Sequence, residues 1–172
     1  MRAFPWVDYV ASKLARLNPG VDNRKLACYA FINNLTRAPS HISMSVLKTF
    51  SNAWTTTYRM HDDERSDCIF GCPGSDDSLA HYFRCPVLAM AVSVALGDPL
   101  PIITPDPIFV LPPPLDSQKD VLRLFIAFHT YHSMKNSNSN MREHCYLQTV
   151  RRAIAARRSA SNMKYTPVRP TA

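Results

Sequence analysis

The chain has 172 residues, of which 46% are hydrophobic and 19% charged. This composition excludes an intrinsically disordered chain, and the length suits one compact domain or two small modules. With four glycines and no glycine-rich phosphate-binding motif, the common nucleotide-binding loops are excluded as well. No apolar stretch approaches the ~20 residues that a membrane span needs. We therefore expect an intracellular protein, nuclear or cytoplasmic, with no membrane partner.

The net charge of +7 comes entirely from the end of the chain. Residues 1–133 hold 12 Lys and Arg against 12 Asp and Glu, so this part is neutral. Residues 134–172 hold eight basic residues and one acid, Glu143. A neutral body with a basic end is typical of proteins that bind phosphate groups, and nucleic acid is the partner we expect. The alternative is a solvated basic tail without a specific partner.

Apolar residues at spacings of three and four predict a mainly α-helical fold. The spacing and the flanking caps or stops predict helices over about 5–17, 23–38, 40–50, 117–134 and 141–158. The apolar positions of the last four patterns include Tyr29; Ile42, Val46 and Phe50; Val121, Leu124, Phe125 and Phe128, continued by Tyr131 and His132; and Val150 and Ile154. Cys28 falls inside the second of these patterns, where it is expected to be a small buried side chain and not a metal ligand. Residues 55–58, three threonines and a tyrosine, favour extended backbone instead.

Changes in composition divide the chain into five regions. Residues 97–116 contain seven of the fourteen prolines, and such a stretch predicts a stiff, extended connector. The predicted regions are a helical region 1–60, a cysteine-containing module 61–96, the proline-rich linker 97–116, a second helical region 117–158 with a basic C-terminal helix, and a disordered tail 159–172.

The strongest local signal is a set of three cysteines and one histidine with the spacing C-x3-C-x8-H-x3-C. Glycine and proline residues after Cys68 and Cys72 allow a tight turn around the first two thiols. We expect His81 and Cys85 to project from one face of a helix that begins near Asp77. Two ligands from a turn and two from a helix can complete a tetrahedral Cys3His site for zinc.

Other interpretations of these residues are weaker. A disulfide framework is disfavoured because the chain has five cysteines, an odd number, and no sign of secretion. Unconnected core thiols remain an alternative, and His61 is a minor contender as a ligand. Four protein ligands leave no open position for water, so we expect a closed, structural zinc site and not a catalytic one.

The block from Leu47 to Leu88 resembles the zinc-knuckle region that follows the polymerase domain in non-LTR retrotransposon reverse transcriptases. The features that carry the resemblance are Trp54-Thr-Thr-Thr-Tyr-Arg59, Cys68-x3-Cys72 and His81-Tyr-Phe-x-Cys85-Pro86. The usual family pattern has four residues between the histidine and the last cysteine, and here there are three. The resemblance implies zinc ligation by Cys68, Cys72, His81 and Cys85, and a role in holding template RNA or target DNA beside a reverse transcriptase core.

The sequence lacks the catalytic motifs of that family, so we expect no enzymatic activity. The nearest string to a polymerase Tyr/Phe-x-Asp-Asp turn is Met60-His-Asp-Asp63, which has no aromatic residue. No Asp/Glu-x-Lys nuclease motif follows Asp106 at a suitable spacing. A solvated acidic turn and a proline-rich linker explain these residues better.

Two arginine pairs lie in the last predicted helix, and residues seven apart share one face of a helix. Arginine forks suit phosphate groups, and nothing in the pattern reads bases, so we expect weakly sequence-selective binding of DNA or RNA. The candidate nucleic-acid-binding residues are Lys135, Arg142, Arg151, Arg152, Arg157 and Arg158.

The sequence thus predicts a non-enzymatic, zinc-stabilised nucleic-acid-binding module, as a fragment or a domesticated remnant of a retrotransposon protein. The alternative is a zinc-stabilised protein-interaction or structural module that binds no nucleic acid of its own.

Overall fold

The computed structural model describes residues 5, 8–9, 11–12, 24–63, 66–98, 118–137 and 145–161. It is mainly helical, as predicted. Within these ranges the extended segments form no strand, only an isolated antiparallel bridge between Asp67 and Asp76. The helices are α2 (Arg24–Arg37), α3 (Ser40–Phe50), α4 (Thr57–Met60), α5 (Leu79–Tyr82), α6 (Pro86–Leu96), α7 (Gln118–Lys135) and α8 (Cys145–Ser161).

Three of the predicted helices are confirmed almost to the residue, as α2, α3 and α7. Helix α8 begins at Cys145 and ends at Ser161, so it extends past the predicted end at residue 158. The first predicted helix falls mostly outside the described residues, of which 8–9 and 11–12 are helical. Residues 99–117 and 162–172, which contain most of the predicted linker and tail, also lie outside them.

Two local predictions differ from the structure. The stretch 55–58 is not extended throughout, because the hydroxyl of Thr56 accepts a hydrogen bond from the Arg59 amide and starts α4 at Thr57. Helix α6 was not predicted at all. Pro86 occupies its first turn, where the missing amide costs nothing, and Gly97, with φ of 70°, ends it in the left-handed conformation.

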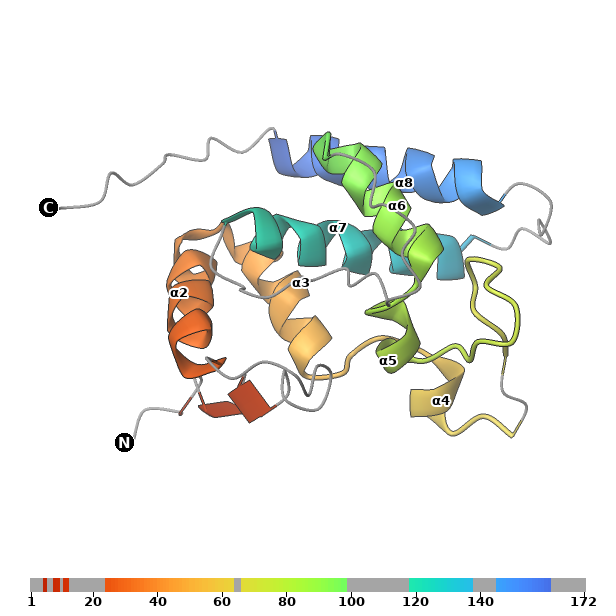
Figure 1. Cartoon of the computed structure of the whole chain (residues 1–172), viewed down its shortest axis with the longest axis horizontal. Coiled ribbons are helices and arrows are strands. Elements are labelled where there is room, and N and C mark those ends of the chain that lie inside the picture. The colour runs from red at the N-terminus through yellow and green to blue at the C-terminus, as the bar shows by residue number, and fades with distance from the viewer. Residues whose placement is uncertain are drawn as a thin grey trace, which may run out of the picture.

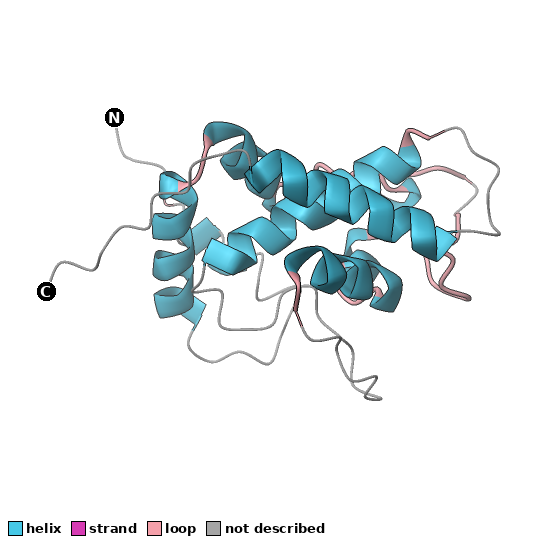
Figure 2. Cartoon of the chain, turned by 90° about the horizontal axis from the view of Figure 1, so that it is seen from above, coloured by secondary structure: helices cyan, strands magenta, loops and turns pink. Residues whose placement is uncertain are grey.

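Helix α7 lies at the centre of the molecule and packs against α2, α3, α6 and α8 (Figure 1). Its predicted apolar face is buried from Val121 to Tyr131, together with the neighbouring Ile126, whereas His132 at the end of that face is half-buried. The view from above in Figure 2 shows helices joined by loops, and α8 packs against both α6 and α7. The long buried face of α7 therefore joins the N-terminal helices to the C-terminal part of the chain.

Helix α8 packs against α6 and α7 through small side chains. Ala153, Ala160 and Thr149 are buried, whereas Val150 and Ile154, which the sequence placed on the packing side, are only half-buried. Facing α8, helix α6 contributes Ala89, Ala91 and Val92 to the core. Small residues allow two helices to approach closely, so the arginines of α8 are left on the outer side.

Charged side chains join the end of α6 to the start of α7. Asp98, directly after α6, forms ion pairs with Lys119 and, at 2.8 Å, with Arg123. Arg123 also binds Asp120 at 3.0 Å on its own helix. The residues on either side of 99–117 are thus held together. None of the helices that the structure describes is long and apolar enough to cross a membrane.

Candidate metal centre

Cys68, Cys72, His81 and Cys85 come together in one cluster, although the last two were expected on a single helix. Their candidate ligand atoms all lie within 4.8 Å of one another. The three cysteines are buried and free of disulfide bonds, and His81 is half-buried. These four residues can hold a metal ion.

A tight turn positions the first two thiols. The Gly71 amide donates to the Cys68 carbonyl at 2.9 Å, and the Cys68 amide donates to the Ser75 carbonyl at 2.7 Å. Gly71 and Gly74 have φ values of 82° and 64°, a conformation that costs glycine little. The two glycines therefore allow a tight loop between the paired residues Asp67 and Asp76, and this loop holds Cys68 and Cys72 close together.

The histidine is positioned by a capped helical turn. Ser78 is the N-cap of α5, and its hydroxyl accepts a hydrogen bond from the His81 amide at 3.2 Å. This cap agrees with the prediction that a helix begins near Asp77. Helix α5 ends at Tyr82, so it has a single turn and cannot also contain Cys85.

Cys85 is the N-cap of the next helix, which corrects the prediction that it shares a helix with His81. Its Sγ atom accepts a hydrogen bond from the Leu88 amide at 3.4 Å. Pro86, the next residue, is the first residue of α6. The three residues between His81 and Cys85 thus include the turn between α5 and α6. This short connection still allows all four candidate ligands to lie close together.

The distances between the cysteine sulfur atoms fit tetrahedral coordination of a metal ion. The Sγ atom of Cys85 lies 3.5 Å from that of Cys72 and 3.9 Å from that of Cys68. A tetrahedron with zinc–sulfur bonds of about 2.3 Å has edges of about 3.8 Å. The Nε2 atom of His81 is buried and has no hydrogen-bond partner among the described residues. Such a buried polar atom normally has a partner, and a metal ion would supply one.

The acid–base properties of the cluster also suit a cation. A hydrogen bond from Cys85 lowers the pKa of Cys68 to about 4 and that of Cys72 to about 7. The same hydrogen bonds, together with burial, raise the pKa of Cys85. The neighbouring Cys68 thiolate raises the pKa of His81, because its negative charge favours the protonated imidazole. Cys68 and Cys72 therefore lose their protons readily, whereas Cys85 keeps its proton in the absence of metal. A divalent ion would bind the thiolates and displace the remaining proton.

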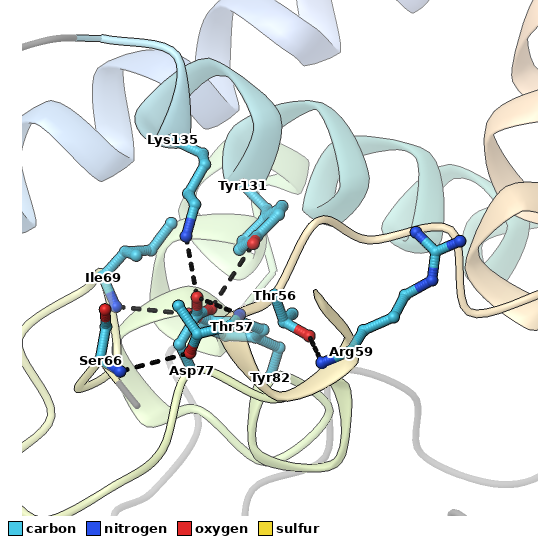
Figure 3. Close-up of polar contacts among 9 residues, drawn as sticks. All are labelled: Thr56, Thr57, Arg59, Ser66, Ile69, Asp77, Tyr82, Tyr131 and Lys135. Atoms are coloured by element: carbon cyan, nitrogen blue, oxygen red, sulfur yellow. Dashed lines mark hydrogen bonds and ion pairs between the residues drawn. The ribbon is translucent and has the colours of Figure 1, made fainter. Parts of the chain in front are cut away.

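A buried carboxylate beside the cluster was missed by the sequence analysis, which treated Asp77 only as a helix start. Its side chain is fully buried and accepts hydrogen bonds from the Thr57 amide at 2.9 Å and the Tyr82 hydroxyl at 2.5 Å (Figure 3). The Tyr131 hydroxyl lies 3.5 Å from Oδ1 of Asp77, and the Lys135 ammonium lies 2.9 Å from Oδ2. Burial, followed by the hydrogen bond to Asp77, raises the pKa of Tyr82. Nothing in a single sequence marks one aspartate in an acidic loop as buried.

The candidate nucleic-acid-binding residues have different surroundings. Arg151, Arg152 and Arg158 are exposed on α8, and Arg157 is half-buried. Lys135 is paired with Asp77 and is 29% exposed. Arg142 lies outside the described residues. The phosphate-binding role of these residues stays a prediction.

The alternative metal ligand, His61, is outside the cluster. It is exposed and forms the left-handed C-cap of α4, with φ of 56°. No family model, curated protein or solved structure matches the chain. The zinc-knuckle resemblance therefore remains a hypothesis.

Proposed function

We propose that the chain is a zinc-stabilised nucleic-acid-binding module without enzymatic activity. The observation that carries the proposal is the Cys3His cluster, whose ligand atoms lie within 4.8 Å of one another. Three thiols and one imidazole are a donor set typical of structural zinc. Hard ions such as Mg²⁺ and Ca²⁺ prefer oxygen ligands and are therefore less well matched to three thiols and an imidazole.

The nucleic-acid part of the proposal is supported by the charge of α8. This helix contains four arginines and no acidic residue. Its buried side, with Thr149, Ala153 and Ala160, packs on the core, while Arg151, Arg152 and Arg158 are exposed. A rigid helix with exposed arginines can contact successive phosphates without reading bases. We further propose that the module descends from the C-terminal region of a non-LTR retrotransposon reverse transcriptase, and that such a polymerase core is a second partner.

The zinc part is tested by the metal content of the purified chain beside that of a Cys72→Ser/Cys85→Ser variant. We expect one zinc per chain in the unaltered protein and none in the variant. Cys28→Ser is the control, because the sequence predicts that Cys28 is not a metal ligand, and it should leave the zinc content unchanged. A well-folded wild-type chain that contains no zinc and takes up none would overturn this part.

The nucleic-acid part is tested by the salt dependence of binding to a labelled DNA duplex. Each phosphate contact contributes about 0.9 to the slope of log K against log salt concentration. Arg151→Gln/Arg158→Gln should reduce the slope by about 2 if both arginines contact phosphate. Arg37→Gln/Lys48→Gln removes the same charge from exposed positions on α2 and α3 and should change it less. Equal slopes for both variants would contradict the α8 surface.

The alternative function is a protein-interaction module, and one observation favours it. Tyr58 and Met60 on α4 are 55% and 56% exposed, close in sequence to the metal-binding loop. A protein partner, such as a polymerase domain, would cover such side chains. Oligomerisation or aggregation of the chain without salt-sensitive nucleic-acid binding would favour this alternative.

A further inference from the structure

Asp77 joins segments of the chain that are far apart in sequence. Its carboxylate contacts α4 through Thr57, α5 through Tyr82 and the end of α7 through Tyr131 and Lys135. In Figure 3 the side chains of Tyr131 and Lys135 reach down from α7 to this one carboxylate. Such a buried junction fixes how the metal-binding module sits on the central helix.

The same residue is linked to the segments that carry the metal ligands. The Asp77 amide donates to the Ser66 carbonyl at 2.9 Å, two residues before Cys68. The Tyr82 hydroxyl donates to Asp77 and accepts from the Ile69 amide at 3.3 Å. Tyr82 directly follows His81. The Asp77–Tyr82–Ile69 connection therefore holds the turn of the first two thiols against the helix of the histidine.

The charge of Asp77 is balanced from outside the module. Its carboxylate is fully buried, and a buried charge is costly unless it is paired and hydrogen-bonded. The one cation bound to it among the described residues is Lys135, 58 residues later in the chain. The module 61–96 thus depends on the last turn of α7 for a compensating charge.

We propose that Asp77, Tyr82 and Lys135 are positioning residues for the metal. Their contacts arrange the four ligands before the ion binds, so that removing the Lys135 charge lowers metal affinity although Lys135 touches no ligand. This inference rests on the proposed zinc site. Partners of this kind outside the ligand set commonly change metal affinity by about 10- to 100-fold when they are lost.

The coupling must act in both directions. If the ion pair favours metal binding, bound metal stabilises the ion pair to the same degree, because the two equilibria are linked. Zinc should therefore protect the amides at the end of α7, near Lys135, from hydrogen exchange, although all four ligands lie in the segment 68–85. Lys135 then serves the metal site and is less available for phosphate.

The test is a zinc titration of the full chain against a chromogenic chelator, with helical content checked by circular dichroism. We expect Lys135→Met to raise the zinc dissociation constant about 10- to 100-fold and Lys135→Arg, which keeps the charge, to restore most of the affinity. Lys119→Met is the matched control, because it removes an ion pair with Asp98 at the opposite end of α7. It should leave the dissociation constant within about 3-fold of wild type, since distant sites couple weakly.

A second variant tests the same inference independently, in case Lys135→Met does not fold. Tyr82→Phe keeps the ring that stacks on Trp54 and removes only the hydroxyl between Asp77 and Ile69, so it should also weaken zinc binding. Cobalt spectra of both variants at saturation should keep the tetrahedral signature, which shows that the ligands are unchanged. Wild-type affinity in folded Lys135→Met and Tyr82→Phe would overturn the inference. Absence of zinc binding by the wild type would overturn the proposed zinc site instead.

Discussion

Trp54 stacks on Tyr82, with ring centroids 5.6 Å apart and planes inclined by 24°. Trp54 follows α3, and Tyr82 directly follows the candidate ligand His81. The same indole ring contacts Tyr131 of α7 at a centroid distance of 4.6 Å, and its Nε1 donates to Thr49 at 3.1 Å. One buried aromatic side chain therefore connects α3, α7 and the metal-binding module.

Loss of this ring should destabilise the whole protein. Trp54→Ala is expected to lower the free energy of unfolding by about 3–5 kcal/mol, because it leaves a cavity and removes the hydrogen bond from the indole to Thr49. Urea unfolding followed by circular dichroism measures the change. Met60→Ala truncates a side chain that is 56% exposed and should change the unfolding free energy by less than about 0.5 kcal/mol. Equal effects would contradict the central position of Trp54.

Chelation of the metal should loosen the module more than the helices around it. The segment 66–85 has only one short helix, whereas α3 and α7 pack directly on each other. Hydrogen exchange with and without chelator should therefore show the largest loss of protection in 66–85. A Cys72→Ser variant should behave like the chelated wild type and show no further change with chelator. Uniform loss across α3 would mean that the metal supports the entire fold.

The cap of α5 should matter for both stability and metal binding. Ser78→Ala removes the acceptor for the His81 amide and is expected to cost about 1 kcal/mol. Because α5 has a single turn, part of this cost should appear as weaker zinc binding. Ser159→Ala at an exposed position on α8 is the control. A variant that loses stability but keeps wild-type zinc affinity would show that α5 is held by its packing and not by its cap.

Two histidines of α7 should make the protein sensitive to acid. Burial lowers the pKa of His129 and of His132, and neighbouring histidines and Lys48 lower both further. Their protonation is thus more favourable in the unfolded chain. The stability that they contribute is present above the unfolded pKa of about 6.5 and is lost as the pH falls through the lowered pKa of the folded state.

His132→Gln should therefore reduce the difference in unfolding free energy between pH 7.5 and pH 5. His132 is the better of the two to change, because its buried Nε2 has no hydrogen-bond partner among the described residues. Measurements in the presence of chelator separate this effect from the acid sensitivity of the metal ligands. His61→Gln is the control at an exposed site. An unchanged pH difference in His132→Gln would contradict the prediction.

The sequence was a good guide where periodicity and caps agree. Ile42, Val46 and Phe50 on α3 and Phe125 on α7 lie on apolar faces that the spacing predicted, and all are buried. Tyr29, placed in the pattern of α2, is instead 60% exposed. Spacing alone shows that a helix is amphipathic, but the neighbouring helices decide which side of it is covered.

The spacing of the cysteines and the histidine predicted the four candidate ligands. It did not predict which helices and turns position them. Cysteine and histidine are chemically distinctive, so four of them close in sequence indicate a metal site. The turn between His81 and Cys85 could not be read from the spacing, because four residues fit either one helical turn or two adjoining helix ends. The contact between Asp77 and Lys135 depends on tertiary packing, which no local pattern reports.

The ion pairs of Asp98 with Lys119 and Arg123 hold together the two ends of the segment 99–117. Residues 98 and 118 are held close together, and α6, α7 and α8 pack on one another on both sides of the intervening segment. A single cut between residues 99 and 117 would leave two pieces that share one core. The two pieces, made separately, should recognise each other and rebuild the fold, and this segment is the natural place to insert a tag or to start a circularly permuted chain.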